Sequence, residues 1–288
     1  MMNFGKILTA MVTPFDEHGN IDFDKTTELI EYLLNNGTDG LVVAGTTGES
    51  PTLTVQEKIK LFKHVVKVVN KRVPVIAGTG NNNTQASIDL TKKAEGIGVD
   101  AVLLVTPYYN KPNQAGLYEH FSKIAEQTNL PIMLYNIPGR TVVSLSADTV
   151  IKLASIPNIV SIKESSGDLD AVSQIIEKTE DNFSVYSGDD SLTLPIMAIG
   201  GHGIVSVSSH VIGNEMQDML DSFQKGDVIK AATIHRQLVP KMKGLFIAPS
   251  PTPVKAALRL KGLDVGNVRL PLVALSSSEE QQIKFLFG

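Results

Sequence analysis

The sequence predicts an α/β fold in which eight strand–helix units close into a (β/α)₈ (TIM) barrel, followed by a small C-terminal helical domain. Short apolar, β-branched runs alternate with amphipathic stretches, and this alternation repeats eight times. From about Gly226 onward only helical patterns remain. A chain of 288 residues suffices for one barrel and a small appendage. We therefore expect the barrel over residues 1–225 and the helical domain over residues 226–288.

The eight apolar runs are short and rich in β-branched residues, which is typical of strands buried on both faces in a helix-covered parallel sheet. The expected strands are Ile7–Val12, Leu41–Ala44, Val73–Ala77, Ala101–Val105, Pro131–Tyr135, Ile159–Ile162, Phe183–Tyr186 and Ile204–Val207. Eight successive units favour a closed barrel, and an open doubly wound sheet is the alternative.

The stretches between the strands carry apolar residues at helical spacing. Examples are Ile59, Phe62, Val66 and Val69 in one stretch and Leu117, Phe121 and Ile124 in another. Helix ends are also marked: a capping box at Thr54 and Glu57, C-terminal glycines at Gly37 and Gly98, an N1 proline at Pro253, a C′ glycine at Gly262, and a capped last helix at Ser277 and Glu280.

Composition excludes several classes of protein. The formal net charge is −4 and the pI about 5.9, without the basic excess of a nucleic-acid binder. Cysteine is absent, which excludes a disulfide framework and a thiolate nucleophile. No signal peptide is apparent, and no apolar run approaches the roughly 20 residues that cross a bilayer. We expect a cytoplasmic protein with neither a nucleic-acid nor a membrane partner.

Polar motifs directly follow the expected strands. They are Thr13–Pro14, Gly45–Glu49, Gly78–Gly80, Thr106–Asn110, Tyr135–Arg140, Lys163–Ser165, Ser187–Asp190 and Ser206–Ser208. The carboxyl ends of the strands of a (β/α)₈ barrel meet at one face, and that face holds the active site. The sequence therefore predicts an active site built from these motifs.

Lys163 is the strongest candidate for chemistry because it ends an apolar strand. Alternation places Ser161 and Lys163 on one face, with Val160 and Ile162 on the other. The simpler interpretation is a lysine that extends from the strand end into water. A lysine inside the barrel mouth, by contrast, has a pKa below its ordinary value of about 10.4, because burial disfavours the ammonium. Such an amine condenses with a ketone to form a Schiff base.

Other strand ends offer a proton shuttle and groups that hold a substrate. Tyr135 ends the neighbouring strand and could pass protons, although a strand tyrosine often serves packing. Thr46 and Thr47 supply hydroxyl and N–H groups for a small carboxylate, with an ordinary glycine turn as the alternative. Arg140 suits a second carboxylate, although a surface arginine is equally consistent.

Competing chemistries lack their sequence signatures. The six histidines show no metal-ligand spacing, and Gly78–Gly80 lacks the third glycine of a dinucleotide fingerprint. The chain contains neither a nucleophile elbow nor a P-loop, and Asp189 and Asp190 would repel a phosphate after the seventh strand. We therefore expect no metal and no cofactor.

Taken together, these motifs resemble the dihydrodipicolinate synthases, over a span from about Gly5 to Leu272. The motifs that carry the resemblance are Gly45–Ser50, Thr106–Asn110, Tyr135–Thr141, Ile162–Glu164, Ser187–Asp190 and Gly201–Val207. The resemblance implies an aldol-type condensation of pyruvate with aspartate semialdehyde, followed by cyclisation and loss of water. It also implies a homotetramer that is a dimer of tight dimers.

The resemblance also assigns roles to individual residues. Lys163 would form the Schiff base with pyruvate. Tyr135, Thr46 and Tyr109 would form the proton relay, with Tyr109 contributed by the neighbouring subunit. The residues that would bind the substrates are Thr47 for the pyruvate carboxylate, the backbone at Gly188 and Val205 for its pocket, and Arg140 for the semialdehyde carboxylate.

Two other functions remain as alternatives. An aldolase of the N-acetylneuraminate lyase type would share Lys163 and Tyr135. Such aldolases usually have Ser-Thr where Thr46 and Thr47 stand and lack Arg140, so both features favour the synthase. A non-catalytic barrel that binds a small acid would have no need of a desolvated amine with a proton relay.

The sequence departs from part of the family at the positions linked to inhibition by lysine. In inhibited synthases, lysine binds at the dimer interface, where a glutamate and a histidine engage its charges. Polar groups are kept here at Ser50, Asn82 and Tyr108. The glutamate position holds Ala86, and the positions often occupied by histidine hold Val55 and Lys58. These replacements predict an enzyme nearly insensitive to lysine.

Overall fold

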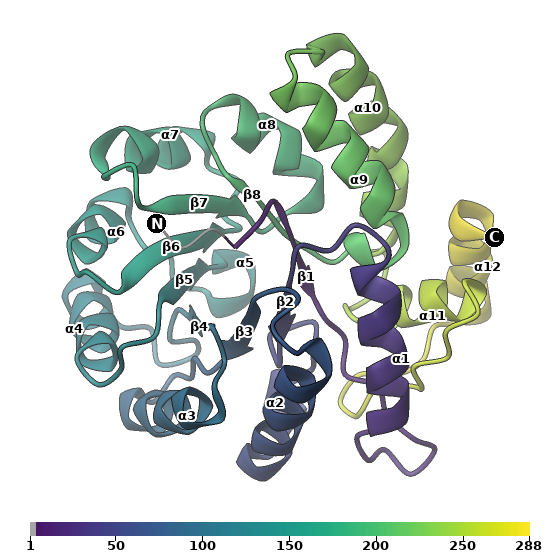
Figure 1. Ribbon diagram of the computed structural model, residues 1–288, viewed down its shortest axis with the longest axis horizontal. Coiled ribbons are helices and arrows are strands. Elements are labelled where there is room, and N and C mark those ends of the chain that lie inside the picture. Colours follow the sequence, from purple (N-terminus) through teal and green to yellow (C-terminus); the bar gives the residue numbers. More distant parts are fainter. Residues whose placement is uncertain (1–3) are drawn as a thin grey trace.

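The protein is a closed eight-stranded barrel in the computed structural model, which describes residues 4–288 (Figure 1). Its strands are β1 (Ile7–Ala10), β2 (Gly40–Val43), β3 (Val75–Gly78), β4 (Ala101–Val105), β5 (Ile132–Asn136), β6 (Ile159–Glu164), β7 (Ser184–Ser187) and β8 (Gly203–Ser206). Each strand pairs in parallel with the next, and β8 returns to β1. The predicted closed barrel is confirmed, and the open-sheet alternative is wrong.

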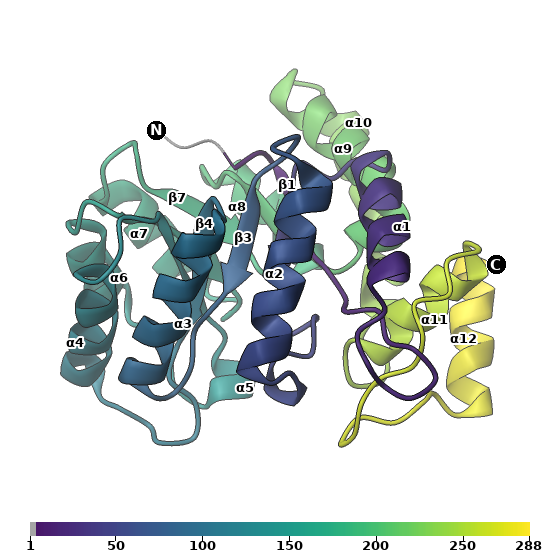
Figure 2. The same cartoon turned by 60° about the horizontal axis from the view of Figure 1, so that its bottom comes forward.

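Helices surround the strands, and the last ones lie to one side of the barrel (Figures 1 and 2). They are α1 (Phe23–Leu34), α2 (Val55–Val69), α3 (Thr84–Ile97), α4 (Gln114–Ala125), α5 (Pro138–Thr141), α6 (Ala147–Ala154), α7 (Leu169–Lys178), α8 (Thr193–Ala198), α9 (Ser209–Gln224), α10 (Val228–Gly244), α11 (Thr252–Leu260) and α12 (Ser277–Phe287). Two 3-10 helices, η1 (Ser50–Thr52) and η2 (Asp190–Leu192), follow β2 and β7. None of the helices in this described part is long and apolar enough to span a membrane.

The predicted helix ends are largely confirmed. Thr54 and Glu57 form the capping box of α2, and Gly98 ends α3 in the left-handed conformation with φ 92°. The last capping box, however, uses Ser276 and Glu279, one residue before the predicted pair. Ser276 has the extended backbone that an N-cap needs, whereas Ser277 is already helical.

The start of α11 also differs from the prediction. Thr252 is its first helical residue, so Pro253 occupies the second position rather than the first. A proline fits there because the N–H groups of the whole first turn have no partner within the helix. Gly262 follows the end of α11 with φ 84°, as predicted.

Two apolar layers fill the molecule. Leu134 and Ile162 point outward into the layer between strands and helices, whereas Met133, Tyr135 and Val205 belong to the barrel interior. The prediction that Val160 lies on the same strand face as Ile162 is wrong, because Val160 packs against the interior layer. The pairing of β5 with β6 shifts register between Ile132 and Met133, and this bulge interrupts strict alternation along β6.

The C-terminal helices pack onto one another and onto the barrel. Helix α10 contacts α9, α11 contacts both α9 and α12, and α10 contacts η2. The predicted domain boundary at 225/226 falls in the turn between α9 and α10, where Gly226 has φ 85°. Because α10 packs on the helix that precedes it, the division into two domains stays a prediction.

Candidate active site at the carboxyl ends of the strands

Lys163 and Tyr135 lie side by side on neighbouring strands. They are register partners in β6 and β5, and Lys163 Nζ lies 4.2 Å from the centroid of the Tyr135 ring. Only 5% of Lys163 and 4% of Tyr135 is exposed. The interpretation of Lys163 as a lysine extending into water is therefore wrong. Its amine lies inside the barrel mouth, over an aromatic ring.

A buried hydrogen bond ties the ends of these two strands together. The Asn136 amide donates to Glu164 Oε2 at 2.9 Å, and Asn136 Oδ1 accepts from the Leu145 N–H at 2.9 Å. Burial raises the pKa of the Glu164 carboxyl. Sequence reasoning gave these two residues no role. The sequence did contain a signal for them. Each is a polar residue that directly follows Tyr135 or Lys163 and lies on the opposite face of its strand.

Gly188 lies directly against the Lys163 side chain. A Cβ at this position would meet Ser165 Oγ at 1.8 Å and Lys163 Cε at 2.9 Å, so a larger residue would displace both. The Gly188 N–H donates to the Glu164 carbonyl at 2.7 Å. Val205 is buried within the barrel on β8. The structure thus brings Gly188 into contact with Lys163 and places Val205 in the same interior layer as Tyr135.

Thr46 and Thr47 lie in a tight turn that follows β2. The Glu49 N–H donates to the Thr46 carbonyl at 3.0 Å, and Thr13 Oγ1 donates to the Gly48 carbonyl at 2.7 Å. Thr47 is buried and Thr46 is half-buried. The turn therefore has a defined shape, anchored to the loop after β1.

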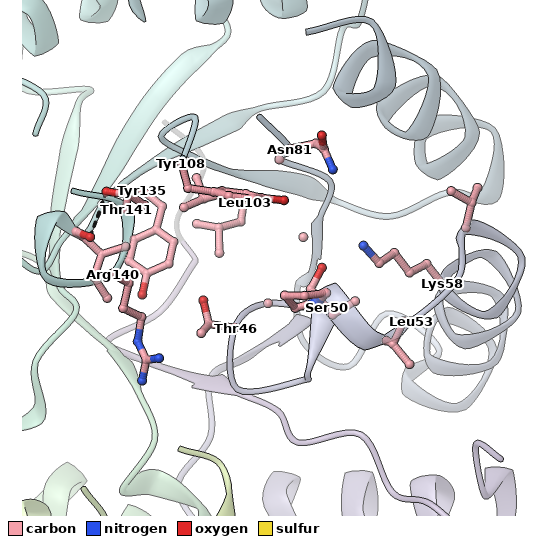
Figure 3. Close-up of a pocket in the computed structure, with 18 residues that line it drawn as sticks. Thr46, Ser50, Leu53, Lys58, Asn81, Leu103, Tyr108, Tyr135, Arg140 and Thr141 are labelled. Carbon is pink, nitrogen blue, oxygen red and sulfur yellow. Dashed lines mark hydrogen bonds between the residues drawn. The ribbon is translucent and has the colours of Figure 1, made fainter. Parts of the chain in front are cut away.

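Two adjoining cavities open at this end of the barrel. The first has a volume of about 470 Å³, and the side chains of Thr46, Tyr135 and Arg140 line it (Figure 3). The second has a volume of about 530 Å³, is lined by Gly188 and by residues of α10, and shares Arg140 with the first. Lys163 contacts one lining residue of each cavity, Tyr135 and Gly188. The Lys163 side chain therefore adjoins the walls of both cavities.

Tyr109 does not join this group within one chain. It is 89% exposed, has a left-handed backbone with φ 75°, and lies outside the residues lining the two cavities. Its neighbours are fixed, because Asn82 Nδ2 donates to the Tyr108 carbonyl and Asn110 Nδ2 donates to the Asn82 carbonyl. The Tyr109 side chain is therefore exposed, while hydrogen bonds fix the backbone of the loop around it.

Asp190 is buried, whereas its neighbour Asp189 is exposed. Its buried carboxylate accepts hydrogen bonds from Ser206 Oγ and from the Ser208 N–H and hydroxyl, and burial raises its pKa. Of the two aspartates that line the second cavity, only Asp189 has an exposed side chain. Asp190 instead holds the turn after β8.

The histidines of the described residues do not gather at the site. Burial lowers the pKa of His210 to about 4, and its ring bridges the Val207 carbonyl and the Val12 N–H. No group of three or more histidine, cysteine or acidic residues within 4–288 has the geometry to hold a metal ion.

Comparisons with known proteins agree with this geometry. The model of the dihydrodipicolinate synthetase family matches residues 3–287. The chain is 65% identical to the 4-hydroxy-tetrahydrodipicolinate synthase of Bacillus velezensis, over 96% of both chains. It is 63% identical to the dihydrodipicolinate synthase DapA-2 of Bacillus anthracis, with a TM-score of 0.99 over 100% of this chain and 98% of the other.

A further solved relative contains a small acid. The chloride-inhibited dihydrodipicolinate synthase of Acinetobacter baumannii, in complex with pyruvate, has 40% identity and a TM-score of 0.95, over 99% of this chain and 98% of that chain. Since the family model and these relatives span nearly the whole chain, the protein belongs to the dihydrodipicolinate synthetase family.

Proposed function

We propose that the protein condenses pyruvate with L-aspartate 4-semialdehyde through a Schiff base on Lys163, giving 4-hydroxy-tetrahydrodipicolinate. One observation carries the proposal: the buried Lys163 side chain places its amine over the Tyr135 ring and packs against Gly188, so that it contacts a lining residue of each cavity. Membership of the family and the names of its close relatives support the same reaction.

The reaction proceeds in three covalent steps. The neutral Lys163 amine attacks the ketone carbon of pyruvate, and the ketone oxygen leaves as water, which forms an iminium. Loss of a methyl proton gives an enamine, whose carbon attacks the aldehyde carbon and forms the new carbon–carbon bond. The amino group derived from the semialdehyde then displaces Lys163 from the iminium carbon, which closes the ring and regenerates the amine.

The surrounding residues serve proton transfer and substrate binding. The Tyr135 and Thr46 side chains extend into the first cavity, where their hydroxyls form the proton relay that Tyr109 of a second copy completes (Figure 3). Thr47 holds the pyruvate carboxylate with its turn N–H groups. Gly188 and Val205 shape the pocket around the adduct. None of these steps, as written, requires a metal or a cofactor.

A steady-state assay with purified protein tests this function. Pyruvate and aspartate semialdehyde should be consumed together, with formation of the cyclic product. The same preparation should not cleave N-acetylneuraminate, the substrate that the rival aldolase would use. Cleavage of N-acetylneuraminate without consumption of the semialdehyde would favour that alternative. Turnover of neither would favour the non-catalytic barrel.

Arg140 is expected to bind the carboxylate of the semialdehyde. It is exposed, and it lines both cavities. Arg140→Ala removes a charge-assisted contact worth about 1.5–3 kcal/mol. We expect kcat/KM for the semialdehyde to fall about 10- to 150-fold, with little change in adduct formation with pyruvate. Kinetics with each substrate varied in turn make the measurement. Equal losses for both substrates would mean that Arg140 binds neither one selectively.

The exposed Tyr109 is expected to complete the site of a neighbouring subunit in a homotetramer built from two tight dimers. Lys163→Ala and Tyr109→Phe homo-oligomers should each be nearly inactive. Mixed and allowed to exchange subunits, they should regain activity, because a mixed dimer contains one site with both residues intact. Native mass spectrometry verifies the exchange. Absence of recovery in an exchanged sample would place Tyr109 in the site of its own chain.

The replacements near Lys58 are expected to make the enzyme nearly insensitive to lysine. Ser50, Val55, Lys58 and Tyr108 line the first cavity, and the Lys58 amine points into it (Figure 3). Ala86 on α3 provides no carboxylate for an effector ammonium. A loss of about 2–3 kcal/mol weakens binding about 30- to 150-fold. Steady-state assays with added lysine make the test. Half-inhibition below about one millimolar would contradict the expectation.

A further inference from the structure

A buried ion pair joins the C-terminal helices to the turn that carries Thr46 and Thr47. Lys255 on α11 and Glu49 in the turn have side chains that are 3% and 1% exposed. Lys255 Nζ lies 2.9 Å from Glu49 Oε1 and forms an ion pair with it. The same ammonium donates to the Asn267 carbonyl at 2.8 Å and lies 4.4 Å from the centroid of the Phe15 ring.

The segment after α11 contacts the second oxygen of the same carboxylate. The Arg269 N–H donates to Glu49 Oε2 at 2.9 Å. The Arg269 side chain donates to the carbonyls of Gly19 and Thr52, each at 2.8 Å, and to Glu57 Oε1 at 2.5 Å. Both oxygens of Glu49 are therefore engaged by residues from the C-terminal part of the chain.

Glu49 controls the turn because its own backbone closes it. It has a left-handed conformation with φ 56°, which is costly for a residue with a side chain. Its N–H donates to the Thr46 carbonyl at 3.0 Å. A strained backbone of this kind persists only where its surroundings hold it. Here the contacts that keep Glu49 in this conformation are made to its carboxylate.

Stability alone does not account for the ion pair. Desolvation of two charges offsets most of their attraction, and neutral side chains of similar volume often pack as stably. The pair does, however, fix one position for the carboxylate, because the ammonium and the Arg269 N–H approach it from defined directions. A fixed carboxylate fixes the turn to which it is attached.

We propose that Lys255 is a positioning residue for pyruvate. Through Glu49 it holds the Thr46–Thr47 turn in the shape that receives the pyruvate carboxylate, so the C-terminal helices complete the pyruvate subsite. This inference rests on the proposed function, because it assigns the carboxylate of pyruvate to that turn. Displacement of binding groups by about 1 Å can cost on the order of 100-fold in rate.

The test replaces Lys255 with methionine, which keeps the length of the side chain and removes its charge. Adduct formation is followed by borohydride trapping at varied pyruvate concentration, and steady-state kinetics are measured with each substrate. We expect the half-saturating pyruvate concentration to rise about 10- to 100-fold, with little change in KM for the semialdehyde. Loss of folded protein alone would lower kcat and leave half-saturation by pyruvate unchanged.

The control variant is Arg259→Gln on the same helix, which removes an exposed ion pair with Asp264 at 3.5 Å and a hydrogen bond to Asn267 Oδ1 at 3.5 Å, and leaves Lys255 and Glu49 in place. It should keep wild-type half-saturation. If Lys255→Met does not fold, the double variant Glu49→Gln with Lys255→Met decides the matter, because it leaves no unpaired buried charge. Wild-type half-saturation in the folded variant would overturn the proposal. Absence of any pyruvate adduct in the wild-type protein would instead contradict the proposed function.

Discussion

Replacement of Lys163 with alanine is expected to lower kcat on the order of 10⁴-fold or more, because the residue forms the covalent bond to the substrate. The side chain is buried near the end of β6, with its amine over Tyr135 and its carbon chain beside Gly188. Without it, neither the iminium nor the enamine can form. The remaining groups could bind pyruvate but could not activate its methyl carbon.

A matched control for this variant is Lys152→Ala. Lys152 is exposed on α6, and its removal takes away one positive charge without touching the barrel mouth. The control should retain wild-type kcat, and both variants should show the circular dichroism and melting behaviour of the folded protein. A Lys163→Ala protein with kcat near the wild-type value would contradict the mechanism.

The second large effect is expected for Tyr135→Phe, which should lower kcat about 10²- to 10⁴-fold. Phenylalanine keeps the aromatic ring beneath the Lys163 amine and the packing within the barrel. Only the hydroxyl is lost, and with it the group that passes protons as water leaves the ketone. Formation of the pyruvate adduct should become slow, and this rate is measured by trapping at short reaction times.

Tyr118→Phe provides the corresponding control. Tyr118 lies on α4 and packs against the layer between strands and helices, away from the two cavities. Removing its hydroxyl should leave kcat and the rate of adduct formation unchanged. If Tyr135→Phe behaved like Tyr118→Phe, Tyr135 would serve packing alone, which is the simpler interpretation that its position on a strand also allows.

The barrel was predictable because local patterns determine it. Each strand is a short apolar run with polar residues at its carboxyl end, and the capping box at Thr54 and Glu57 depends on side chains three residues apart. The placement of Lys163 also followed from its own strand. Its burial required only that the residue after Ile162 point into the barrel, and the structure confirms this.

Features that depend on distant partners were not predictable from the chain alone. The bulge that turns Val160 inward arises from the pairing of β6 with β5, which no pattern within β6 reveals. The contact between Glu49 and Lys255 joins residues far apart in the sequence. The structural role of Asp190 depends on Ser206 and Ser208, which belong to the next strand and turn. Tertiary contacts, rather than local propensity, decide all three.

The most direct measurement of the central claim is mass mapping after borohydride reduction in the presence of pyruvate. Reduction converts the iminium to a stable secondary amine, so digestion and tandem mass spectrometry locate the added three-carbon acid. The mechanism predicts one adduct, on Lys163, with loss of activity in proportion to its formation. An adduct on Lys58, Lys255 or any other lysine with Lys163 unmodified, or inactivation without an adduct, would contradict it.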